Sequence, residues 1–217
     1  MSLLQGQVGA IVKLQDGSQP NVLLGQSAEL IQAPLHAEYY TQASRGNLFV
    51  GNQAAAGAVV PIYSSTTQQC GLLNPANSGV NIVPVRINFG YVDTTGAAGS
   101  FCLGYITDGQ GIIATAGKGV TVATVTTPIN LNLGGRPSKA IFMSSAITTV
   151  APGLLMQLGV NQLVTTAATT SATTFESKYD FNGQVVMSPG TGIFVAGNIA
   201  VLVKMAISII WEEVPIV

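Results

Sequence analysis

The sequence contains a single histidine, His36, and histidine is the side chain that most often serves as a catalytic base or a metal ligand. A zinc site built on imidazole needs several histidines, and one chain cannot supply them. A Ser-His-Asp triad would have to use His36 as its base. His36 stands just before Tyr39 and Tyr40, and we interpret it as a partly buried structural residue.

Carboxylates could do acid–base work, as the paired acids of glycosidases do. Glu212 and Glu213 are adjacent, but neighbours on a strand point to opposite sides and cannot form a working pair by themselves. Asp93 and Asp108 both lie in turn sequences. A calcium site would need several such oxygens to converge, and we interpret both aspartates as solvated turn residues.

A glycine-rich stretch at residues 109–119 could be taken for a phosphate-binding loop. In that motif four residues separate the two glycines, and Ser or Thr after the lysine holds magnesium. Here five residues separate Gly111 from Gly117, and Gly119 stands at the magnesium position. We interpret the stretch as a hairpin and expect no catalytic residue, cofactor or metal in the chain.

Cysteines and aromatic residues are better explained by packing. Cys70 and Cys102 are too few for a disulfide framework and have apolar neighbours, which predicts reduced core cysteines. Several aromatic residues could furnish a sugar-binding platform, but most stand in β-type runs, and we favour core packing. They are Tyr39, Tyr40, Phe49, Tyr63, Phe89, Tyr91, Tyr105 and Trp211.

The most informative element is the stretch 198–217, which alternates with a period of two. One side is heavily apolar, with Val201, Val203, Met205, Ile207, Ile209 and Trp211. The other is mostly small or short, with Ala200, Leu202, Lys204, Ala206, Ser208 and Ile210. This pattern predicts a core strand of a β-sandwich, and we expect another subunit to cover its second face.

A second long strand is predicted after a turn at residues 74–79. One face would carry Val83, Val85, Ile87, Phe89 and Tyr91, and the other Ile82, Pro84, Arg86, Asn88 and Gly90. Because Pro84 lacks an N–H, we expect a free edge or a bulge there. Shorter strands are predicted within residues 59–63, 69–73, 100–106, 120–126, 139–144, 154–160, 184–187 and 192–196.

Short strands at this spacing, with no convincing helix, indicate an all-β fold, a jelly-roll-like antiparallel β-sandwich. We assign the sandwich to residues 35–217 and an extended N-terminal arm to residues 1–34, which mix polar turns with short apolar runs. A helix at 27–31 could form but would be short. The Thr- and Ala-rich run at 165–174 predicts an exposed loop.

Composition points to assembly. Charged residues are 8 % of the chain, against about 25 % in an ordinary soluble domain. A freely diffusing monomer with so few charges would be poorly soluble, which predicts a homo-oligomer. The eight basic residues are scattered, which argues against nucleic-acid and membrane partners. We see no secretory signal and no run near the ~20 apolar residues of a membrane span.

Several stretches together resemble a group of β-sandwich structural proteins encoded by tailed bacteriophages. They are residues 24–31, 35–49, 74–81, 181–183, 188–191 and 211–215. These are fold and surface motifs, so no active-site residues carry over. The resemblance implies a virion protein made in the bacterial host cytoplasm and a homotrimer. The single histidine and the lack of a metal cluster or phosphate loop predict that it is not an enzyme. Its partners would be the major capsid protein or other virion proteins.

Two functions are compatible with this resemblance. The preferred one is a capsid cement (decoration) protein that binds and stabilises the head shell. The alternative is a fibre or spike head module that binds a host glycan or surface protein. Copy number and position in the particle would distinguish the two.

Overall fold

The computed structural model describes residues 37–54, 56–93, 99–107, 121–148, 153–162, 177–198 and 204–216. The chain divides into two units, Met1–Tyr40 and Thr41–Val217, and only residues 37–40 of the first are described. Several predicted features lie outside the described residues. They are His36, Asp108, the arm at 1–34, the helix at 27–31, the glycine-rich stretch and the loop at 165–174.

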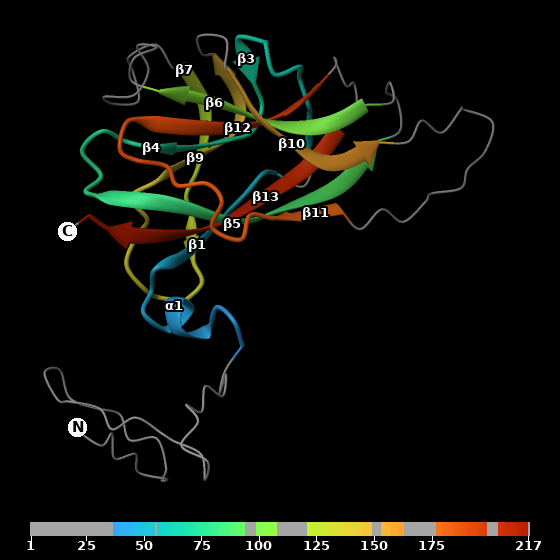
Figure 1. The fold of residues 1–217 in the computed structure, drawn as a ribbon. Coiled ribbons are helices and arrows are strands. Elements are labelled where there is room, and N and C mark those ends of the chain that lie inside the picture. The colour runs from blue at the N-terminus through green and yellow to red at the C-terminus, as the bar shows by residue number, and fades with distance from the viewer. Residues whose placement is uncertain are drawn as a thin grey trace, which may run out of the picture. The chain divides into compact units, whose positions relative to one another are not determined.

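The described part of the second unit is a sandwich of two antiparallel sheets (Figure 1). The first sheet has the order β11 (Ser177–Asp180), β5 (Val80–Asp93), β13 (Lys204–Pro215), β1 (Leu48–Asn52) and β8 (Ile129–Asn130), and β2 (Ala58–Val59) also pairs with β13. The second has the order β10 (Gly153–Gln162), β6 (Gly99–Thr107), β12 (Thr191–Gly197), β4 (Gly71–Asn74), β9 (Ile141–Thr148) and β3 (Thr67–Gln68), and β7 (Thr121–Thr126) pairs with β9. The predicted all-β sandwich is confirmed.

The strand pairs are nested. β1 pairs with β13, β4 with β12, β5 with β11 and β6 with β10, as in a long hairpin that folds back on itself. Strands β7, β8 and β9 interrupt this order between β6 and β10, and we call them the excursion. β8 extends the first sheet beyond β1, and β9 extends the second sheet beyond β4.

The core lies between the two sheets, and the apolar face of β13 packs into it. Met205, Ile207, Ile209 and Trp211 are buried, while the residues between them are partly exposed. The predicted faces are confirmed from Lys204 onward. The predicted start at residue 198 is wrong, because Asn198 follows β12 and its N–H donates to the Ser100 carbonyl.

Trp211 ties the two sheets together. Its indole stacks on Phe49 of β1 at 6.2 Å and on Phe142 of β9 at 6.4 Å between ring centroids. Phe49 lies in the same sheet as Trp211, and Phe142 lies in the opposite sheet. Stacked aromatic rings bury large apolar areas, so these three side chains form the centre of the core at the β1 side.

Of the two features expected at Pro84, a free edge or a bulge, the structure shows an irregularity of the bulge type. The ladder between β5 and β13 skips Val85, the residue directly after Pro84. An extra residue reverses the alternation of faces, so Val83 is only partly buried and Ile82 is fully buried, opposite to the prediction. Beyond the bulge the predicted apolar face is buried at Val85, Ile87 and Phe89.

The shorter predicted strands have mixed outcomes. The runs within 69–73, 100–106, 120–126, 139–144, 154–160 and 192–196 overlap β4, β6, β7, β9, β10 and β12. Only Val59 of the run 59–63 is in a strand, because Pro61 follows closely and cannot donate a ladder bond. The run 184–187 follows a tight turn at Asn182-Gly183, where φ is 49° and 75°, and it is reduced to an isolated antiparallel bridge between Met187 and Ile82. β1, β3, β8, β11 and the five-residue helix α1 (Tyr40–Ser44) were not predicted.

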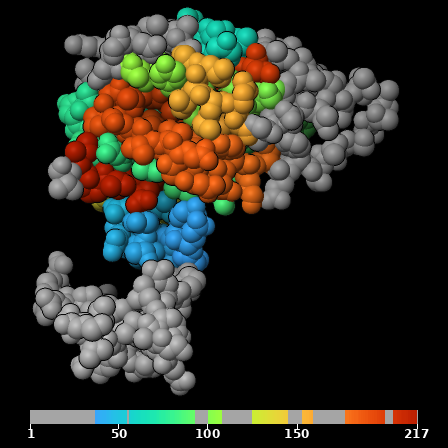
Figure 2. All heavy atoms as spheres, viewed as in Figure 1, coloured from blue at the N-terminus to red at the C-terminus, as the bar shows by residue number. Residues whose placement is uncertain are grey.

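The second sheet is apolar on both faces. Leu73, Ile106, Met143 and Phe194 form a buried cluster separate from the main core. Ile193 and Val195 flank Phe194 on β12 and belong to the main core. Since neighbours on a strand point to opposite faces, the separate cluster lies on the outer side of this sheet. Residues 177–198, coloured orange, and residues 153–162, coloured amber, cover much of the sandwich surface seen in Figure 2.

Candidate functional site

The two adjacent glutamates of β13 point to opposite sides, as predicted. Glu213 continues the buried face of the strand and is 0 % exposed, while Glu212 is partly exposed on the outer face. Glu213 is the one charged residue among the buried residues of the described chain. A buried carboxylate is costly unless donors surround it, so the groups around Glu213 decide what this carboxylate can do.

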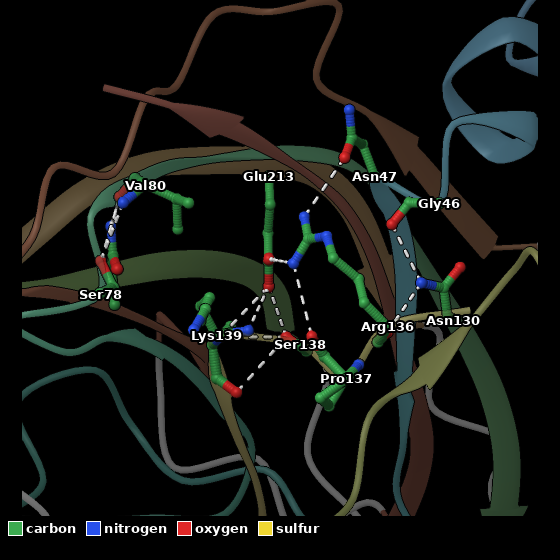
Figure 3. Close-up of polar contacts among 12 residues, drawn as sticks. Gly46, Asn47, Ser78, Val80, Asn130, Arg136, Pro137, Ser138, Lys139 and Glu213 are labelled. Carbon is green, nitrogen blue, oxygen red and sulfur yellow. Dashed lines mark hydrogen bonds and ion pairs between the residues drawn. The ribbon is translucent and has the colours of Figure 1, made fainter. Parts of the chain in front are cut away.

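Donors from one segment surround the Glu213 carboxylate (Figure 3). Its Oε2 accepts a bond from Arg136 Nη1 at 2.6 Å. Its Oε1 accepts from the Ser138 hydroxyl at 2.6 Å and from the backbone N–H groups of Lys139 at 2.7 Å and Ala140 at 3.3 Å. We call this arrangement the Glu213 clamp. All its contacts to the carboxylate come from residues 136–140, which lead into β9.

Arg136 holds the clamp against the first sheet. Its Nη2 donates to Asn47 Oδ1 at 3.3 Å, and its guanidinium carbon lies 4.9 Å from the centre of the Phe49 ring. The backbone N–H of Glu213 donates to the Asn47 carbonyl. A planar guanidinium can make these directional bonds and stack on a ring at the same time, which a lysine cannot do.

Asn130 and Asn132 fix the chain between β8 and the clamp. The Asn130 side chain donates to the Gly46 carbonyl at 3.0 Å and the Arg136 carbonyl at 2.9 Å. Its Oδ1 accepts from the backbone N–H of Asn132 at 2.8 Å. The Asn132 amide donates to the Ser44 carbonyl at 3.1 Å. Residues 131–140, the crossing segment from the first sheet to the second, are thereby bonded at both ends.

The Glu213 clamp is a structural site. A proton-transfer group needs access to a reacting group, whereas this carboxylate is fully buried and accepts four hydrogen bonds from its own chain. No described residues form a cluster of three or more His, Cys, Asp or Glu side chains suited to a metal. The clamp therefore fixes the path of the crossing segment.

Gln53 is a second buried polar link that the sequence did not indicate. Its Nε2 donates to the Gln69 carbonyl at 2.7 Å and to the Ser144 carbonyl of β9 at 3.1 Å. Its Oε1 accepts from the backbone N–H of Ile207 in β13 at 3.0 Å. The side chain thus bridges the two sheets through their main chains, and it is 8 % exposed.

Both cysteines are free and buried, as predicted. Burial raises the pKa of the Cys70 thiol far above its usual range and that of the Cys102 thiol to about 11. A thiol with a raised pKa carries little thiolate, which is the reactive form. Neither cysteine is therefore suited to act as a nucleophile.

The aromatic residues divide between core and surface. Phe49, Phe89 and Trp211 are buried, so the core interpretation is confirmed for them. It is wrong for Tyr40, Tyr91 and Tyr105, which are 51 %, 47 % and 37 % exposed. Tyr91 lies near the end of β5, where a second register shift disturbs its pairing with β13.

The first sheet contains a second ion pair. Arg86 of β5 and Asp180 of β11 form an ion pair across the first sheet. Within the described part of the chain no helix is long and apolar enough to cross a membrane. Comparison with known proteins finds no family model, no curated protein and no solved structure that matches this chain.

Proposed function

We propose that the sandwich is a jelly roll with one insertion. The support is the nested pairing, in which the eight strands β1, β4, β5, β6, β10, β11, β12 and β13 form four consecutive antiparallel pairs. Two Greek keys in two packed sheets give this arrangement, which occurs in viral capsid proteins, lectins and cupins. The excursion β7–β9 would then be inserted at the fold of the hairpin.

The function we propose is that of a structural virion protein, a capsid cement or decoration protein of a tailed bacteriophage. The observation that carries it is the Glu213 clamp, in which the buried charge serves to hold a segment of chain and is closed to substrate. The low charge of the chain and the resemblance of its motifs to phage structural proteins support the same function. It would act as a homotrimer on the major capsid protein and would not be an enzyme.

The test is the position of the protein in the particle. A cement protein is expected in hundreds of copies over the icosahedral shell, which immunogold or low-resolution imaging of labelled virions would reveal. Purified protein should also bind shells that lack it and raise the temperature at which they break. Labelling confined to a few copies at the tail would contradict the cement function.

The alternative function is a fibre or spike head that binds a host glycan. It is favoured by Tyr91 and Tyr105, whose exposed rings could stack on sugars. If this alternative is right, replacing both with serine should abolish adsorption to host cells. If it is wrong, the replacement should leave shell binding unchanged.

Release of reducing sugar from host polysaccharide by the purified protein would contradict the non-enzymatic function.

A further inference from the structure

Strand β8 and the start of the crossing segment carry large apolar side chains that face solvent. Ile129, Leu131 and Leu133 are 49 %, 38 % and 82 % exposed, and Leu133 is the most exposed large hydrophobic residue of the described chain. Asn130, between the first two, is buried at 8 % exposure. This alternation inverts the usual pattern, because polar groups point inward and apolar groups point outward.

The backbone that displays these side chains is held in place. Asn130, Asn132 and the Glu213 clamp bond it at both ends, and Gly135 N–H donates to the Asn132 carbonyl at 2.7 Å. A Cβ at Gly135 would lie 2.8 Å from Asn130 Nδ2, so the turn is closely packed. An ordered segment loses little conformational entropy when a partner covers it, which favours binding.

The apolar surface continues from the edge of the first sheet onto its outer face. Ile129 lies opposite Val50 of β1, and Val50 lies opposite Ile210 of β13. Val50 and Ile210 are both half-buried. A partner seated on the crossing segment could therefore extend its contact across neighbouring strands, and clusters of exposed apolar residues of this kind mark interaction sites.

We infer that the excursion surface, made of Ile129, Leu131 and Leu133, is covered by a second copy of this chain. The charges beside it are largely compensated within the chain. Arg136 pairs with Glu213, and the positive charge of Arg45 acts on the Glu212 carboxyl, partly opposing the rise in pKa that burial causes there. The exposed Lys139 alone offers too little charge to select an acidic partner. Two copies can thus approach without like-charge repulsion, and each offers the uncharged surface that the other needs.

This inference rests on the proposed homo-oligomeric assembly and identifies the surface that joins its copies. The experiment compares Leu131→Asp and Leu133→Asp with Leu154→Asp, a matched control on β10 that is 43 % exposed. Light scattering at micromolar concentration gives the mass, and circular dichroism checks the β content. We expect the wild type and the control to be oligomeric and both excursion variants to associate at least about tenfold more weakly, since a buried charge at a contact costs more than 1.4 kcal/mol.

Three outcomes would overturn the inference: a monomeric wild type, an unchanged mass for both excursion variants, or equal dissociation of the control. If the variants fail to fold, hydrogen exchange of the wild type decides. Amides of residues 129–135 should gain protection as the concentration rises through assembly, and unchanged protection rejects the surface. Shell binding is measured separately. A protein that assembles through this surface but binds no shell would contradict the cement function alone.

Discussion

At the scale of single residues, the energetics of Glu213 depend on donors that lie far away in the sequence. Arg136 is 77 positions from Glu213, and both are held by the fold. Glutamine at this position would keep the size of the side chain but turn an amide N–H group towards donors. A buried charge pair that loses one partner leaves the other without compensation.

We expect Glu213→Gln to lower the free energy of unfolding by about 3 kcal/mol. Urea denaturation followed by Trp211 fluorescence would measure this change. The neighbouring substitution Glu212→Gln is the matched control, and it should change stability by less than about 0.5 kcal/mol because Glu212 is partly exposed. Equal effects of the two substitutions would show that the clamp does not stabilise the fold.

Glu212 gives a prediction about pH. Burial raises the pKa of its carboxyl above the ordinary value, and the Arg45 guanidinium partly opposes this. A raised folded-state pKa means that the folded chain binds this proton more tightly than the unfolded chain does. The resulting stability is present below the unfolded pKa and is lost as the pH rises through the folded pKa.

The unfolding free energy of the wild type minus that of Glu212→Gln should therefore fall with rising pH. Urea titrations at several pH values would show it, and a rising difference would contradict the raised pKa.

At the scale of elements, the longest strands could be predicted from the sequence, and the two-residue strands β3 and β8 could not. β13 alternates apolar and small residues over many positions. Glu213 lies two residues after Trp211, on the apolar side, so the alternation in the sequence already indicates that Glu213 is buried. β8 has two residues, too few to display a period. The inward turn of Asn130 and its distant partners depend on tertiary contacts that local pattern does not encode.

The crossing segment can be tested through its two asparagines. Asn130→Ala should destabilise the protein by about 2 kcal/mol, because it leaves the Gly46 and Arg136 carbonyls without this donor. Asn132→Ala removes one bond near the surface and should cost less than about 1 kcal/mol. Thermal denaturation would rank the two variants. A larger loss for Asn132→Ala would mean that the segment is anchored elsewhere.

At the scale of the whole molecule, a trimer brings two different surfaces of the same chain together. Ala206 lies on the outer face of β13, opposite Gly90 of β5, where we predict coverage by another subunit. Ala206→Lys should therefore weaken assembly, as light scattering would show. If the excursion surface of one copy meets this face of the next, Ala206→Lys and Leu133→Asp chains should be separately monomeric and form dimers when mixed. A mixture that stays monomeric would contradict this pairing of surfaces.

The predicted arm, residues 1–34, is expected to tether the sandwich to the particle. Apolar residues that cannot form a core by themselves must bury against something else, since ordering each residue costs about 1–2 kcal/mol. A chain that lacks residues 1–34 should stay folded and oligomeric but no longer attach to particles deficient in this protein. Co-sedimentation with such particles would measure attachment. Unfolding or dissociation of the truncated chain would instead assign the arm to the protein's own assembly.

The position of β13 has a consequence for biosynthesis. This strand comes after all other described strands in chain order, yet it lies between β5 and β1 in the middle of the first sheet. During translation β1 and β5 therefore leave the ribosome before β13, the strand that pairs with both. Leu48 of β1, for example, cannot pair until Glu212 has been added. Pairing over such a separation is slow and exposes strand edges meanwhile. The first sheet can therefore close only after β13 has emerged, so the edges of β1 and β5 need protection until then.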